Sequence, residues 1–203
     1  FFAAIMTTEV HNLDRFVVFV NEAREKGINV FLPDVNLSDY DFKIEESFEN
    51  NDEIKKIGIR FGLFAVKGIG AALINEIKKE RENGKFTSYE DFVYRMKQNG
   101  ITKKQLESLI LSGALDKLNG NRFEKYKSID EILEYSQKKY ESEEDLQMIL
   151  FSGEKEFKGK FEMEKADEFP QKVLLENEKE LQQNGKAVIF IHNGSNQTIT
   201  DKR

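Results

Sequence analysis

The residues best suited to binding chemistry form a glycine-containing turn, Val66-Lys67-Gly68-Ile69-Gly70, which a helical pattern follows directly. Glycine allows backbone conformations that a Cβ would forbid. A turn of this kind presents N–H groups at a helix N-terminus, where a phosphate binds readily. Ile69 is expected to be buried and to hold the turn in place. The predicted phosphate-binding residues are Lys67, Gly68, Ile69, Gly70, Lys78 and Lys79. An ordinary glycine-containing turn is the alternative.

A second turn has a similar layout. A predicted helix over 103–111 leads into Ser112-Gly113-Ala114-Leu115-Asp116, and Asn119-Gly120-Asn121-Arg122 opens the next helix. Two helix–hairpin–helix candidates in one chain indicate a tandem that holds both strands of a duplex through phosphates, without reading bases. The candidate residues here are Ser112, Gly113, Asn121 and Arg122. A helical bundle with glycine C-caps would look the same locally.

A short apolar stretch, Gln147-Met148-Ile149-Leu150-Phe151, interrupts an acidic segment. A polar anchor followed by spaced aliphatic groups and a phenylalanine is typical of peptides that dock into a preformed pocket of a partner. The alternative is a helix end folded onto its own domain, and the residues by themselves favour that alternative.

No catalytic constellation emerges from the sequence. The chain has no cysteine and only two histidines, which excludes disulfides and cysteine catalysis and argues against a histidine-rich metal site. Asp39 and Asp41 lie in a predicted loop without flanking strands that would hold them at metal distance. No run of 18 or more apolar residues occurs, so no membrane span is expected. A cysteine-free chain without a signal peptide fits the cytoplasm.

Charge is distributed unevenly along the 203 residues, whose formal net charge is −6. Residues 53–127 carry 16 basic and 9 acidic residues, whereas residues 128–180 carry 8 basic and 16 acidic ones. An acidic whole argues weakly against nucleic acid, because phosphate binding depends on cationic groups. The basic middle weakens that objection, although such a segment is more often a solvated face.

Hydrophobic periodicity predicts an α+β fold that is mainly helical. Helices are expected over about 10–26, 71–82, 88–99 and 103–111, with another running from Asn121 through Leu133. Short strands are expected over 28–32, near 42–44 and over 57–63. Residues 141–169 are interpreted as an acidic linker. A short helix from Pro170 and a strand over 187–191 end the chain.

Several ordered motifs resemble one family, the alpha (catalytic) subunits of bacterial DNA polymerase III, which are C-family replicative polymerases. The motifs that carry this resemblance are Phe2–Glu9, Gly27–Val30, Pro33–Asn36, Ile59–Gly70, Leu109–Asp116, Gly120–Arg122 and Gln147–Phe151. The resemblance extends from Phe1 to about Leu181. It then departs near Gln182, where a deletion or a junction is suspected.

The resemblance implies four regions. Residues 1–60 would be the end of the fingers domain, 61–140 a tandem helix-hairpin-helix region that binds double-stranded DNA, 141–169 the linker with a clamp-binding peptide, and 170–203 a short helix and strand. Gln147, Met148, Leu150 and Phe151 would dock on the sliding clamp, the beta subunit. Other replisome subunits would be further partners.

The resemblance also implies the location of the chemistry. The Mg²⁺ ions would lie in the palm of the full-length polymerase, with no cofactor in this fragment, which should therefore be inactive alone. Two rival hypotheses remain. One is a protein-interaction scaffold that never contacts DNA, and the other is a complete small enzyme.

Overall fold

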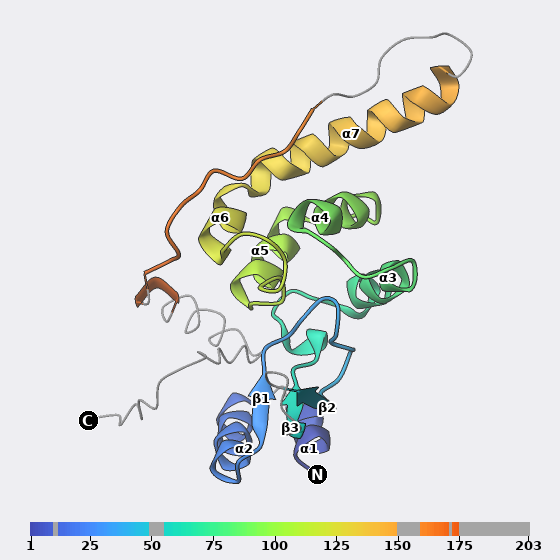
Figure 1. Cartoon of the computed structure of the whole chain (residues 1–203). Coiled ribbons are helices and arrows are strands. Elements are labelled where there is room, and N and C mark those ends of the chain that lie inside the picture. Colours follow the sequence, from blue (N-terminus) through green and yellow to red (C-terminus); the bar gives the residue numbers. More distant parts are fainter. Residues whose placement is uncertain (10–11, 49–54, 150–158, 171, 175–203) are drawn as a thin grey trace.

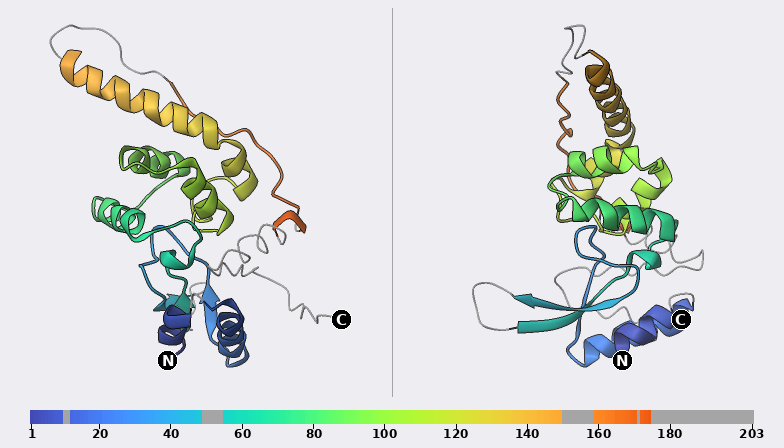
Figure 2. Two further views of the ribbon diagram at one scale, coloured as in Figure 1. Left: turned by 180° about the vertical axis from the view of Figure 1, so that it is seen from behind. Right: turned by 90° about the vertical axis from the view of Figure 1, so that its right-hand side faces the viewer.

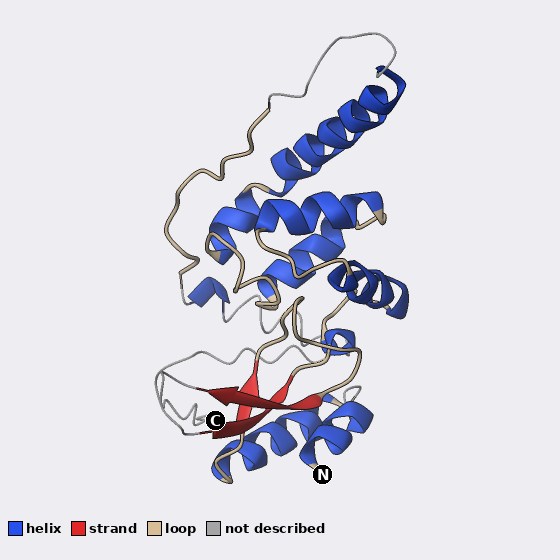
Figure 3. Ribbon diagram, turned by 45° about the vertical axis from the view of Figure 1, so that its right-hand side comes forward, coloured by secondary structure: helices blue, strands red, loops and turns tan. Residues whose placement is uncertain are grey.

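The computed structural model describes residues 1–9, 12–48, 55–149, 159–170 and 172–174 (Figure 1). It confirms an α+β fold that is mainly helical, with a small sheet and the two N-terminal helices at one end and the other helices stacked beyond them (Figure 3). In chain order the elements are α1 (Phe2–Glu9), α2 (Leu13–Glu25), β1 (Asn29–Phe31), β2 (Lys43–Phe48), β3 (Lys55–Arg60), the 3-10 helix η1 (Leu63–Ala65), α3 (Ala71–Glu82), α4 (Tyr89–Gln98), α5 (Lys103–Leu111), α6 (Arg122–Lys127) and α7 (Ile129–Ile149).

The sheet has the strand order β1-β3-β2, with β1 parallel and β2 antiparallel to β3. Ile59 pairs with Val30 on one side and with Ile44 on the other. Helices α1 and α2 cover the face that carries Ile59, since Phe2 and Met6 share a buried cluster with it. The cover is incomplete, because Ile44 on the same face stays largely exposed.

The second core lies among α3, α4, α5 and α7, where the apolar residues recur at three- and four-residue spacing. Its helices begin at the predicted caps. The Ser88 hydroxyl accepts a hydrogen bond from the Asp91 amide, and Thr102 forms a reciprocal capping box with Gln105. Among the described residues, no helix is long and apolar enough to cross a lipid bilayer.

The single helix predicted from Asn121 through Leu133 is wrong, because two helices, α6 and α7, meet at Ser128. The Ser128 hydroxyl donates to the carbonyl oxygen of Lys125, and the Ser128 carbonyl accepts from the Ile132 amide, so this residue ends α6 and starts α7. The predicted linker is also partly wrong, because α7 continues to Ile149.

Residues 159–170 depart from the free linker that the sequence suggested. They form an extended segment that runs back along α7 and α6, and we call this segment the strap (Figure 2). The helix predicted from Pro170 begins as expected, because the amides of Val173 and Leu174 donate to the Pro170 carbonyl. The predicted strand at 187–191 and the suspected junction near Gln182 lie outside the described residues.

The loop between β1 and β2 connects the two cores, although the sequence placed it with the N-terminal region. Val35 is buried in the helical core, and its amide donates to the carbonyl of Ala114 at 3.0 Å. The Asn36 side chain donates to the Phe86 carbonyl and accepts from the Phe86 amide at 2.9 and 2.8 Å. Arg81 of α3 donates to the carbonyls of Val35 and Ser38.

We predict that Asn36→Ala lowers the free energy of unfolding by about 1–3 kcal/mol, because both Phe86 backbone groups lose their partner in a partly buried site. Chemical denaturation measures the change. The control is Asn75→Ala, which removes the same side chain from an exposed position on α3. Equal losses in the two variants would show that the Asn36 contacts contribute nothing specific.

Candidate nucleic-acid interface

The first predicted turn lies between η1 and the N-terminus of α3. Gly68 has a φ of +77°, in the left-handed region that glycine favours. Ile69 is completely buried in the helical core, as the sequence predicted, whereas Gly68, Gly70 and Ala71 are exposed. The element before the turn is only a three-residue 3-10 helix, so the first motif lacks a full leading helix.

The N-terminus of α3 is open. Gly70 is its N-cap residue, in an extended conformation with φ −104° and ψ 170°, and no described side chain caps the helix there. The first-turn N–H groups of a helix have no intrahelical acceptor. In α3 these groups belong to small, exposed residues, Ala71 and Ala72, so an anion can approach them closely.

The cations near this turn come from two elements. Lys67 belongs to the turn itself. Helix α5 packs against the turn, since a Cβ on Gly68 would lie 3.6 Å from the Ser108 hydroxyl. That hydroxyl donates to the carbonyl of Lys104, an exposed residue one helical turn earlier. Lys104 lies on the same side of α5 as Ser108, and only the packing of α5 turns that side toward Gly68. Sequence reasoning therefore missed Lys104.

Lys78 and Lys79 lie in the second half of α3, away from its open end. The Lys78 ammonium is 3.8 Å from an Asp39 oxygen, and the Lys79 ammonium is 3.6 Å from a Glu76 oxygen. Asp39 also accepts hydrogen bonds from Lys43 and Arg81. Although burial opposes it, the contacts with Lys43, Lys78 and Arg81 leave the pKa of Asp39 below its usual value. Both lysines remain exposed, but each has a carboxylate close by.

The second predicted turn differs from the first in its burial. Ser112, Gly113, Ala114 and Leu115 are all buried. The amides of the first three donate to the carbonyls of Ser108, Ile110 and Leu109, so they form the C-cap of α5. This arrangement is the glycine C-cap that the sequence left open as the alternative. The turn amides are therefore occupied by the helix that precedes them.

Arg122 and Asn121 are engaged within the protein. The Arg122 guanidinium donates to both Asp116 oxygens, at 2.8 and 2.5 Å, and its side chain is only 12% exposed. It lies over Gly113, where an added Cβ would clash with it. The Asn121 side chain caps α6 by accepting from the Glu124 amide, and it also donates to the Ala166 carbonyl.

Two ionisable groups lie inside this corner, Glu124 and Lys125. Glu124 accepts from the amides of Asn121 and Ala166, and these two contacts hold the pKa of its carboxyl below the usual value. Lys125 is 1% exposed and donates to the carbonyl of Gly120. Burial lowers the pKa of the Lys125 ammonium, while the charges of Asp116 and Glu168 oppose that shift.

The predicted docking peptide falls at the end of α7. Gln147 and Met148 belong to that helix, whereas Leu150 and Phe151 lie outside the described residues. The peptide therefore begins as helix rather than as the exposed linker that the sequence suggested. Docking on a partner stays a prediction.

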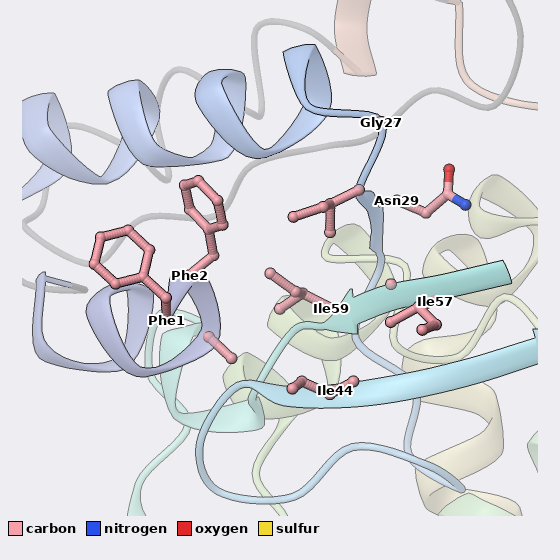
Figure 4. Close-up of a pocket in the computed structure, with 10 residues that line it drawn as sticks. Phe1, Phe2, Gly27, Asn29, Ile44, Ile57 and Ile59 are labelled. Carbon is pink, nitrogen blue, oxygen red and sulfur yellow. The ribbon is translucent and has the colours of Figure 1, made fainter.

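An open groove of about 720 Å³ lies on the sheet, between α1 and the strands (Figure 4). Phe1, Phe2, Ile44, Ile57 and Ile59 are among the side chains that line it. None of the side chains that line it is ionisable, so these side chains supply no general acid or base.

The chain is similar to known proteins over most of its length. The family described as "Helix-hairpin-helix motif" matches residues 27–125. The chain is 38% identical over 135 residues to the DNA polymerase III subunit alpha of Borreliella burgdorferi, covering 66% of this chain and 11% of the relative. It is 32% identical over 180 residues to the Bacillus subtilis subunit, covering 89% of this chain and 15% of the relative.

A third relative, the DNA polymerase III subunit alpha of Thermus aquaticus, is 37% identical over 139 residues, which is 67% of this chain and 10% of the relative. The chain is therefore homologous to a segment of DNA polymerase III alpha subunits, as the motifs indicated. It spans less than a fifth of the length of these relatives.

We predict that Gly113→Ala destabilises the fold more than Gly100→Ala. Both glycines have a φ of +79°, so each alanine costs about 1 kcal/mol of backbone strain. Only at Gly113 does the new Cβ also displace the Arg122 guanidinium from Asp116, which adds roughly 1–3 kcal/mol. Thermal unfolding compares the variants, and equal melting temperatures would refute a structural role for Arg122.

Proposed function

We propose that this chain is a non-catalytic part of a replicative DNA polymerase and that it binds double-stranded DNA without sequence specificity. The observation that carries the proposal is the uncapped N-terminus of α3, where exposed Gly68, Gly70 and Ala71 lie beside the buried Ile69. Homology to DNA polymerase III alpha subunits and the helix-hairpin-helix match support it.

Phosphate contact is the proposed mechanism. The first-turn amides of α3 bind a phosphate oxygen, and Lys67 supplies the adjacent charge, with Lys104 of α5 as a further cation. Backbone amides and lysines contact only the sugar-phosphate chain, so every sequence binds alike. The excess of basic residues over 53–127 adds a favourable, salt-sensitive term.

In this proposal the second turn has a mainly structural role. The amides of Ser112 and Gly113 cap α5, and Arg122 is paired with Asp116. These residues position the helices that surround the first turn. Direct phosphate contact is assigned mainly to the residues around Gly68 and Lys67.

We further propose that Gln147, Met148, Leu150 and Phe151 dock on the sliding clamp. Such tethering raises the effective concentration of DNA at the turn without tighter individual contacts. The full-length protein would carry out DNA-directed DNA synthesis in the cytoplasm with other replisome subunits. Its catalytic Mg²⁺ ions would be held by palm carboxylates, and nucleotidyl transfer depends on such ligands.

We predict that Lys67→Glu weakens duplex binding equally on unrelated sequences, because it places a negative charge beside the phosphate. The combined variant Lys67→Glu, Lys78→Glu and Lys79→Glu should weaken binding further. Loss of each phosphate contact should reduce the slope of log affinity against log salt by about 0.9. Fluorescence anisotropy with two unrelated duplexes at several salt concentrations measures both quantities.

The matched control reverses three exposed lysines elsewhere, Lys26, Lys85 and Lys138. It changes the net charge by the same amount, but it leaves Lys67 in place at the open end of α3. If the control weakens binding as much as the triple variant, only overall charge matters and the assignment of this turn fails. A scaffold that never contacts DNA would show no salt-dependent binding at all.

We predict that replacing Leu150 and Phe151 by alanine abolishes clamp binding and leaves duplex binding unchanged, because the docking peptide loses both apolar anchors. Surface plasmon resonance against an immobilised clamp measures the first effect. The control truncates two exposed apolar residues elsewhere, Val18 and Ile57, to alanine. Unchanged clamp affinity in the Leu150 and Phe151 variant would disprove the docking role.

A further inference from the structure

The strap, residues 159–170, is acidic on its outer side and apolar on its inner side. Phe161 and Met163 pack against the helical core, and Phe169 lies edge-on to Phe123 at 4.9 Å between ring centroids. The exposed residues between these contacts are mostly acidic, namely Glu162, Glu164, Asp167 and Glu168. Figure 1 shows the strap following α7 and then passing α6.

The contacts of the strap concentrate on α6, the helix of the second turn. Glu168 accepts hydrogen bonds from the backbone amides of Arg122 and Phe123, at 3.1 and 3.0 Å. Glu164 pairs with Lys127 at 2.6 Å. Two carboxylates of the strap therefore occupy donors of α6, namely the amides of its first two residues and the Lys127 ammonium at its end.

We infer that the strap is an intramolecular competitor of polyanions: its carboxylates cover the α6 face of the second turn, and duplex DNA must displace them to reach that face. The inference rests on the proposed function. With the strap bound, DNA is held through the first turn alone. With the strap released, Lys127 loses Glu164 as its partner and the repulsion from the strap carboxylates is removed, so a phosphate chain can pair with Lys127.

The contacts that hold the strap on α6 are weak enough for a polyanion to displace it. The Lys127–Glu164 pair is exposed on both sides, at 50% and 74% of the side chains, and exposed ion pairs contribute little to stability. Phe161, Met163 and Phe169 are only partly buried. The strap is nevertheless part of the same chain, so its high effective concentration makes it bind until a polyvalent anion replaces it.

The proposal is tested with the double variant Glu164→Gln and Glu168→Gln. Glutamine keeps the shape of glutamate and one acceptor oxygen, so the apolar contacts of the strap are retained, but the charge is gone and position 168 keeps only one of its two acceptors for the α6 amides. The matched control, Glu162→Gln with Asp167→Asn, removes the same charge from strap residues that make no hydrogen bond or ion pair with α6 in the part of the chain that the structure describes. Affinity for a nonspecific duplex is measured by anisotropy from low to moderate salt.

We expect the test variant to bind the duplex about three- to tenfold more tightly at low salt, with a steeper salt dependence, and the control to change less than about twofold. Equal affinities of the two double variants would overturn the inference. A second measurement is deuterium uptake of residues 159–170 in the unmodified protein. Uptake should rise when duplex DNA is added, and an unchanged or lower uptake would also overturn it.

Lys67→Glu separates this outcome from a failure of the proposed function. If Lys67→Glu weakens duplex binding while the two strap variants behave alike, the strap inference is wrong and the proposed function stands. If the unmodified protein binds no duplex, or Lys67→Glu binds as well as the unmodified protein, the proposed function itself is wrong.

Discussion

The burial of Ile69 is the constraint on which the candidate interface depends. Its side chain is completely enclosed in the helical core, while its neighbours Gly68 and Gly70 remain exposed. A side chain anchored in this way fixes the turn relative to α3 and α5, so the amides at the start of α3 are held in position before any ligand arrives. Preorganised donors of this kind cost little ordering entropy on binding.

The loop between β1 and β2 links that interface to the sheet. Val35 enters the helical core, Asn36 binds both backbone groups of Phe86, and Arg81 binds the loop carbonyls. Gly62 permits the close return of the chain, because a Cβ there would clash with the Tyr40 carbonyl oxygen. The motifs around Pro33–Asn36 and Ile59–Leu63 are thus explained by contacts between the two cores rather than by chemistry.

The two turns show how similar local sequences acquire different roles. Both contain a glycine with positive φ followed by a helix. At Gly68 the preceding element is a short 3-10 helix and the following helix starts uncapped. At Gly113 the preceding element is a full helix, whose last carbonyls take up the turn amides, and Arg122 closes over the glycine. The first turn is left open to solvent and the second is closed.

Local sequence determined much of this protein. Glycines, cap residues and periodic apolar positions predicted α3, α4 and α5 to within a residue, the three short strands and the burial of Ile69, because these depend on interactions within a few residues. The order of the motifs along the chain separately carried the resemblance to DNA polymerase III alpha subunits. Tertiary structure decided the rest. The break at Ser128, the pairing of Arg122 with Asp116, the packing of α5 against Gly68 and the docking of the strap on α6 depend on contacts beyond the periodic pattern or on a local bond that competes with the helix. Periodicity carries no information about such partners, since it records which side of an element is apolar and not what that side meets.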